Sequence, residues 1–221
     1  MQALLILAAT ALITGPALAF AEPSPADNPP GAVQSANTPD EAQKLPAGKF
    51  VQDLGNQAIA QVANPNISED QKKRKYQDLL RSSFDMQAIA HFVAGRAWNN
   101  APEEQRQEYL KLFEQMVVET YGDKLDLYSG ESFRVKSVRP ESEKDMIVSS
   151  EITHPDGSRP AKVDWRVRKL DADKLAIVDV VVEGVSQSIT QREEYSSIIH
   201  RDGGKLDGLI KLMRKRVNQP G

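Results

Sequence analysis

The chain has 221 residues, a formal net charge of −3 and 40% apolar residues, which suits one folded domain with a sizeable core plus additional segments. A charge so close to neutral argues against the clustered basic surface typical of nucleic-acid-binding domains. The absence of cysteine excludes disulfide bonds, thiolate metal sites and cysteine nucleophiles.

Residues 1–21 have the pattern of a secretory signal peptide. A short apolar run is followed by Gly15-Pro16 and by two small-x-small cleavage patterns, which end at Ala19 and Ala21. The run is shorter than the roughly 20 residues of a membrane-spanning helix. No Lys or Arg precedes Lys44, so either the true start lies upstream or the signal is atypical. An uncleaved membrane anchor is the alternative interpretation. We expect export, with cleavage after Ala19 or Ala21.

Residues 22–46 form a segment of different composition. It contains six prolines and almost no large apolar residue. Such a segment cannot bury enough surface to offset the entropy of ordering the chain. We therefore predict a disordered, proline-rich linker at 22–46, followed by a folded domain at 47–221.

The folded domain is predicted to begin with helices. Apolar residues recur at helical spacing over residues 50–62. Ser68 and Gln71 form a capping box that opens a second helix. Asp85 is placed as the N-cap of a third helix, and Gly95 as its end.

The fourth helix is predicted to be the longest. Asn100 together with Glu103 is expected to open it. An apolar stripe then continues from Tyr109 to Tyr128 with sustained i, i+3, i+4 spacing, which is typical of an amphipathic helix.

After Gly130 the apolar period changes from 3.6 to 2, which predicts strands. Alternation marks residues 133–136, 146–152 and 163–167, an apolar run marks 175–183, and Pro155-Asp156-Gly157 is a strong turn signal. Two helices, at 190–200 and 206–217, are expected to follow. The predicted class is α+β, with a twisted antiparallel sheet of about four strands packed against N- and C-terminal helices.

No recognisable catalytic constellation accompanies these elements. His91, His154 and His200 lack metal-ligand spacing, and neither a GxSxG elbow nor a phosphate-binding glycine loop is present. We predict no metal, no cofactor and no enzymatic activity. A Ser-His-acid triad stays open, since its members need not be near one another in sequence.

One strand alternates charged with apolar residues. Asp164, Arg166 and Arg168 are expected to point away from the apolar face, and Asp179 can pair with one of the arginines across the sheet. These charges are interpreted as a solvated sheet face, with a partner-docking patch as the alternative.

Four stretches together carry a family resemblance. They are FDMQAIAHFVAGRAW at 84–98, VDWRVRK at 163–169, VDVVVEGVSQSITQREEYSSIIHRDG at 178–203 and KLDGLIKLMRK at 205–215. In this order they resemble the MlaC family, also called the toluene-tolerance auxiliary family, over residues 50–217. His91 and Thr190-Gln191 depart from the family pattern. The matching positions are Phe84-Asp85, Gly95, Trp98, Tyr121, Val163-Asp164, Arg166, Arg168, residues 180–186, Arg192, Glu194 and Tyr195.

The resemblance implies a decorated NTF2-like fold with an apolar cavity between sheet and helices. It also implies a monomeric periplasmic carrier of diacyl phospholipid, which maintains outer-membrane lipid asymmetry. The implied partners are an outer-membrane lipoprotein complex and an inner-membrane ABC transporter complex, with neither nucleic acid nor stable membrane insertion.

An apolar stripe at helical spacing is usually core, and the resemblance favours a cavity instead. The residues expected to line it are Phe92, Trp98, Phe113, Met116, Val117, Tyr121, Leu125, Phe133, Val148, Val163, Trp165, Val167, Val180, Val182, Val185, Tyr195, Ile199, Leu209 and Met213.

Two other functions fit the same pattern. One is a carrier of hopanoid or another isoprenoid lipid. The other is a small NTF2-like enzyme acting on an apolar substrate, for which Asp179, Glu183 or His91 would have to supply the acid–base pair.

Overall fold

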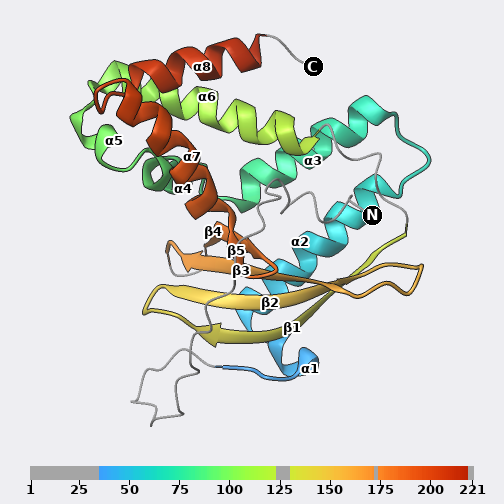
Figure 1. Ribbon diagram of the computed structural model, residues 1–221. Coiled ribbons are helices and arrows are strands. Elements are labelled where there is room, and N and C mark those ends of the chain that lie inside the picture. The colour runs from blue at the N-terminus through green and yellow to red at the C-terminus, as the bar shows by residue number, and fades with distance from the viewer. Residues whose placement is uncertain (1–34, 123–129, 172–173, 219–221) are drawn as a thin grey trace.

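The computed structural model describes residues 35–122, 130–171 and 174–218 (Figure 1). The elements in these ranges are α1 (Pro39–Ala42), α2 (Pro46–Val62), α3 (Glu69–Ser83), α4 (Met86–Ala94), α5 (Arg96–Asn100), α6 (Glu103–Gly122), β1 (Ser132–Pro140), β2 (Asp145–Thr153), β3 (Ala161–Lys169), β4 (Leu175–Val182), β5 (Val185–Ser186), α7 (Gln187–Arg201) and α8 (Asp207–Val217).

The strands form one antiparallel meander in the order β1-β2-β3-β4-β5. Trp165 of β3 lies opposite Val148 on one side and Val180 on the other, so these apolar residues share one face. The predicted α+β class is confirmed. The two-residue β5 is an addition, made by a tight turn in which Glu183 and Gly184 both have positive φ.

Helix α2 covers the apolar face of the sheet and forms the first core cluster with it (Figure 1). Val51, Leu54 and Ala58 are buried on the inner side of α2. Gly55 lies against the ring of Phe133, where a Cβ atom would collide with the ring. A glycine inside this helix is therefore explained by close packing on β1, despite its low helix propensity.

Residues 35–46 have a defined structure in contact with the sheet. Ala36 pairs with Val138 through two backbone hydrogen bonds of 2.8 Å, and Ala42 of α1 is fully buried. These contacts give the backbone groups at the free edge of β1 hydrogen-bond partners. Composition predicted disorder because large apolar residues are scarce here, but small alanines suffice to pack against an edge strand. The linker prediction is corrected for residues 35–46, whereas residues 22–34 and the predicted signal peptide at 1–21 lie outside the described residues.

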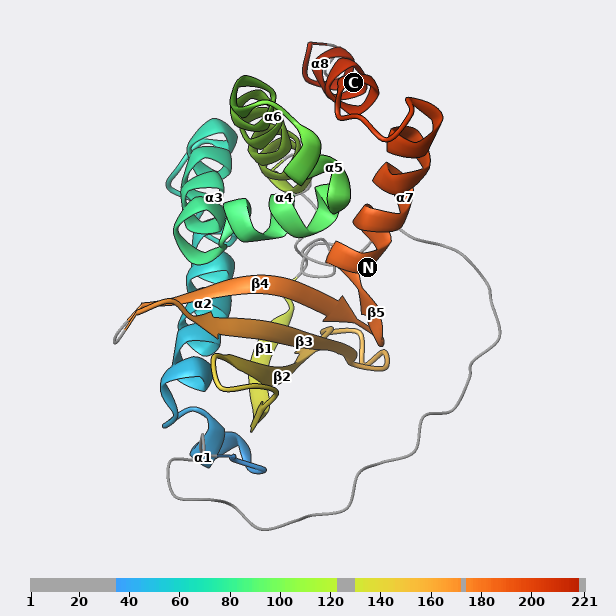
Figure 2. The ribbon, with the colours of Figure 1, turned by 90° about the vertical axis from the view of Figure 1, so that its left-hand side faces the viewer.

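Helices α4 to α8 form a second layer, which meets the sheet at β4 (Figure 2). Their buried residues make a second core cluster in which the described strands take no part. Tyr109 of α6 is fully buried within it and donates a hydrogen bond of 3.0 Å to the Ala90 carbonyl of α4. Burial also raises the pKa of Tyr109.

The predicted helix ends are mostly confirmed. Ser68 and Gln71 form the capping box of α3, Asp85 caps α4, and Gly95 follows α4 with φ +56°. The prediction that Asn100 opens the longest helix is wrong, because Asn100 is the last residue of α5. Pro102 forces the preceding residue out of the helical region, and the chain therefore breaks before α6.

Candidate functional site

A cavity of about 70 Å³ lies between α3, α4, α6, α7 and the edge of β4. It occupies the junction of the two core clusters, because Leu80 and Val180 belong to the first and Val93 and Phe113 to the second. Most of the lining is apolar. The lining residues are Leu80, Phe84, Met86, Ile89, Val93, Phe113, Val117, Asp179, Val180, Gln187, Ser188 and Gln191.

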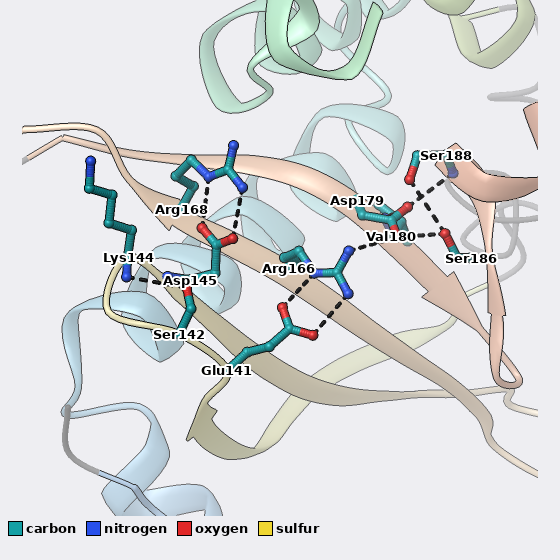
Figure 3. Close-up of polar contacts among 10 residues, drawn as sticks. All are labelled: Glu141, Ser142, Lys144, Asp145, Arg166, Arg168, Asp179, Val180, Ser186 and Ser188. Atoms are coloured by element: carbon teal, nitrogen blue, oxygen red, sulfur yellow. Dashed lines mark hydrogen bonds and ion pairs between the residues drawn. The ribbon is translucent and has the colours of Figure 1, made fainter. Parts of the chain in front are cut away.

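The polar lining residues gather where β4 meets the start of α7. The carboxylate of Asp179 is only 3% exposed and accepts hydrogen bonds from the Ser188 backbone N–H at 3.0 Å and the Ser186 hydroxyl at 2.6 Å (Figure 3). Ser186 is the N-cap of α7, and Asp179 adds a second acceptor with a negative charge at the positive end of the helix dipole. The cavity has an apolar interior and one polar edge.

Behind Asp179, an ionic network crosses the outer face of the sheet (Figure 3). Arg166 Nη1 lies 3.6 Å from Asp179 Oδ2, which confirms the predicted cross-strand pair. The same guanidinium forms a bidentate pair with Glu141 at 2.6 and 2.9 Å. Hydrogen bonding to Glu141 raises the pKa of Arg166, so this arginine is a permanent cation beside the buried carboxylate.

A second bidentate pair lies on the same face. Arg168 donates to both oxygens of Asp145 at 2.7 Å, which joins β3 to the start of β2. Hydrogen bonding to Arg168 lowers the pKa of the Asp145 carboxyl. Arg166 and Arg168, which were predicted to lie on a solvated face, are therefore held in defined pairs.

The structure distributes the predicted lining residues over several environments. Phe113, Val117 and Val180 line the cavity. Phe92 and Val185 are exposed. Leu125 and the Tyr121 side chain lie outside the described residues. Six predicted residues pack in the first core cluster: Phe133, Val148, Val163, Trp165, Val167 and Val182. Six others pack in or against the second core cluster: Trp98, Met116, Tyr195, Ile199, Leu209 and Met213.

The sequence reasoning missed the contribution of α3 and α4. Leu80, Phe84, Met86, Ile89 and Val93 line the cavity, and four of them lie within the 84–98 stretch that carried the resemblance. The predicted lining residues from that stretch were the aromatic Phe92 and Trp98, and its aliphatic residues were not predicted. The aliphatic i, i+4 pair Ile89–Val93 was the available signal for the inner face of α4.

The histidines lie apart. His91 is exposed and its ring centroid is 5.1 Å from that of Trp98, whereas His154 is buried with Nδ1 3.3 Å from Glu131 Oε1. Among the described residues, no three His, Asp or Glu side chains are grouped as metal ligands.

Comparison with known proteins decides the family. The sequence pattern described as "MlaC protein" matches residues 52–215, which is most of the chain. The chain belongs to the MlaC family. This agrees with the resemblance found in the four apolar stretches.

One similar relative is the "Intermembrane phospholipid transport system binding protein MlaC" of Haemophilus influenzae, 24% identical over 130 residues. The match covers 58% of this chain and 60% of that MlaC family member.

A similar solved structure is the phospholipid-binding protein of Ralstonia solanacearum in complex with a phospholipid. It has a TM-score of 0.67 and 20% sequence identity, and the match covers 77% of this chain and 96% of that protein. This likeness supports the MlaC-like fold. In the part of the chain that the structure describes, no helix combines the length and apolarity needed to cross a membrane.

Proposed function

We propose that this MlaC family member binds a diacyl phospholipid and carries it through the periplasm between the two membranes. The observation that carries the proposal is an apolar cavity with a single polar edge, placed between two separate core clusters. Such a site suits a ligand with an apolar body and one polar end. The relatives' names, which refer to phospholipid binding and intermembrane phospholipid transport, support the same ligand class.

The physical need for a carrier follows from the hydrophobic effect. Each methylene exposed to water costs about 0.8 kcal/mol, so two sixteen-carbon chains cost on the order of 25 kcal/mol. A free phospholipid therefore almost never leaves its bilayer unaided. A protein cavity as apolar as the bilayer interior makes the exchange nearly neutral in free energy.

The cavity must widen to take such a ligand. Its volume of about 70 Å³ is far below the roughly 300–1,000 Å³ of typical ligand pockets. The two clusters that border it share no residue, and separating them enlarges the cavity without dismantling either one. In the described conformation the cavity is therefore too small for a diacyl ligand.

The direction of transport and the partners belong to the same proposal. We infer that the protein receives and delivers lipid at an outer-membrane lipoprotein complex and an inner-membrane ABC transporter complex. The intermembrane transport system named for the Haemophilus influenzae relative supports this role. The predicted signal peptide at 1–21 supports a periplasmic location.

Binding is favoured over catalysis by the chemistry of the lining. Asp179 is the ionisable residue among those that line the described cavity, and it is engaged in hydrogen bonds at the start of α7. Glu183 accepts a hydrogen bond from the Lys162 backbone N–H, and the His91 ring contacts the Trp98 ring at a tilt of 38°. A single engaged carboxylate does not supply the acid–base pair that the alternative enzyme would need.

The proposal is tested by the lipid content of the purified protein. Native mass spectrometry should detect diacyl phospholipid bound to the full chain. Val117→Phe, which narrows the cavity, should remain folded and lose most of the lipid, whereas Val185→Phe at an exposed position should keep it. Lipid-free protein that also refuses phospholipid from vesicles would disprove the proposed function.

A further inference from the structure

Helices α4 and α7 pack side by side along a seam that has two different sides (Figure 2). On the inner side, Val93 of α4 and Gln191 of α7 line the cavity. On the outer side, Phe92 and Ile189 are 42% and 47% exposed, which is unusual for such large apolar side chains. Arg192 lies on this outer side, one residue after a lining residue.

Arg192 connects the two helices across the seam. Its guanidinium lies over the Phe92 ring, 4.8 Å from the centroid, and Nη1 donates a hydrogen bond of 3.1 Å to the Phe92 carbonyl. Nη2 lies against the backbone at Gly95, where a Cβ atom would be only 3.3 Å away. The residue that ends α4 therefore leaves room for the guanidinium.

This arrangement leaves most of the guanidinium available for a ligand. A guanidinium has five N–H donors. Within the described residues, the guanidinium of Arg192 makes one hydrogen bond, to the Phe92 carbonyl. No described carboxylate lies within salt-bridge distance of Arg192, in contrast to Arg166 and Arg168. The contact with the Phe92 ring and the hydrogen bond to the Phe92 carbonyl hold the guanidinium in place. A planar, oriented fork of this kind matches a phosphate in bidentate geometry.

The position of Arg192 also suits a lipid head group. The polar lining residues Gln187, Ser188 and Gln191 all lie on the first turns of α7, so the polar end of a ligand belongs beside this helix. The nearby negative charge of Asp179 is balanced by Arg166 and by the start of α7. Among the described residues Arg192 therefore has no counter-charge, and it directly follows the polar lining residue Gln191.

We propose that Arg192, held on Phe92, is the phosphate-binding subsite for the phosphodiester of the bound lipid. The inference rests on the proposed phospholipid binding and adds a specific group to it. It assigns Phe92 the role of a platform for the guanidinium.

The test compares two lipids that share their acyl chains. Lipid-free protein is incubated with vesicles containing dioleoylphosphatidylethanolamine or dioleoylglycerol, and loading is measured by native mass spectrometry. The wild type should load the phospholipid about tenfold better or more, the factor expected for a charge-assisted bidentate contact. Arg192→Gln should remove this preference and leave loading with dioleoylglycerol unchanged. Arg201→Gln, the same charge change at the exposed end of α7, should behave as the wild type.

The outcomes separate the inference from the proposed function. If the wild type loads neither lipid, the carrier function itself fails. If Arg192→Gln keeps the preference for the phospholipid, or loses both lipids equally, the phosphate subsite is refuted while lipid binding by the wild type stands. Saturable binding of inorganic phosphate alone, present in the wild type and lost in Arg192→Gln, would assign the arginine to a free anion and overturn the head-group role.

Discussion

At the scale of single residues, Asp179 is the side chain that ties α7 to the sheet. Replacing it with alanine leaves the Ser188 N–H, the Ser186 hydroxyl and Arg166 without their shared acceptor. Breaking a buried, hydrogen-bonded charge pair typically costs about 3–5 kcal/mol, and we expect Asp179→Ala to lose about 3 kcal/mol of unfolding free energy. Urea denaturation measures this loss.

The control for Asp179→Ala is Asp164→Ala. Asp164 is a half-buried carboxylate on the same outer face of the sheet, with no hydrogen bond to a described residue. The Asp164→Ala substitution should lower the free energy of unfolding by no more than about 0.5 kcal/mol. Equal stability of the two variants would show that the hydrogen bonds of Asp179 at the start of α7 contribute little.

Of the contacts of Asp179, the sequence predicted the ion pair with Arg166 but not the hydrogen bonds at the start of α7. Strand alternation placed Arg166 and Asp179 on one face, and the structure pairs them across β3 and β4. The hydrogen bonds to Ser186 and Ser188 were missed, because they depend on a reversal of the chain at Glu183-Gly184. Alternation predicts which face of the sheet a side chain occupies. The tight turn with positive φ decides that the following segment, with Ser186 and Ser188, folds back onto Asp179.

At the scale of elements, the contact of α2 with β1 depends on Gly55. In an open helix, Gly→Ala is stabilising by up to about 1 kcal/mol. At Gly55 the new methyl group would meet the Phe133 ring, and overpacking typically costs about 1–3 kcal/mol. We therefore expect Gly55→Ala to lower the melting temperature. Gln57→Ala, at an exposed position of the same helix, should leave it nearly unchanged; a stabilised Gly55→Ala would mean that the ring moves aside freely.

The Arg168–Asp145 pair between β2 and β3 should make stability depend on pH. Because Arg168 lowers the pKa of Asp145 in the folded protein, the pair contributes stability above the usual Asp pKa of about 3.9. This contribution is lost as the pH falls through the lower folded pKa. Partial exposure limits it to about 1 kcal/mol.

The matching experiment follows Asp145→Asn by thermal unfolding at neutral and at strongly acidic pH. The variant should be less stable than the wild type at neutral pH, and the difference should disappear in acid. Glu143→Gln, an exposed change in the neighbouring turn, should show no such convergence. A difference that persists in acid would attribute the effect of Asp145→Asn to packing.

Element prediction succeeded where periodicity or capping chemistry was strong. The meander, the capping box at Ser68 and the cap at Asp85 were all predicted from local patterns. The start of the fold was not, since Ala36 and Ala42 are ordered by contacts with a strand about a hundred residues away. Local composition contains no information about such a distant edge.

At the scale of the whole molecule, the division into two core clusters is the feature that the sequence did not reveal. The apolar stripes on helices and strands look alike in sequence, and all were candidates for one cavity. In the structure, the sheet residues pack on α2 and α3, and helices α4 to α8 pack on one another, with the small cavity at the junction of the two clusters. The chain topology decides which apolar stripes pack against each other, and sequence periodicity does not contain this information.

This division predicts where the protein changes when it takes up lipid. Widening the cavity separates the layer of α4, α6 and α7 from the edge of β4, while β1–β3 and α2 keep their own core. Hydrogen exchange should therefore differ between lipid-loaded and lipid-free protein in α4, α7 and the β4 edge, and be unchanged in β1–β3, whose amides report the stability of the first cluster. Loading should also raise the melting temperature, because the ligand binds only the folded state. Exchange that changes equally across β1–β3 would mean that the acyl chains enter the sheet–α2 core, and the junction would then not be the lipid site.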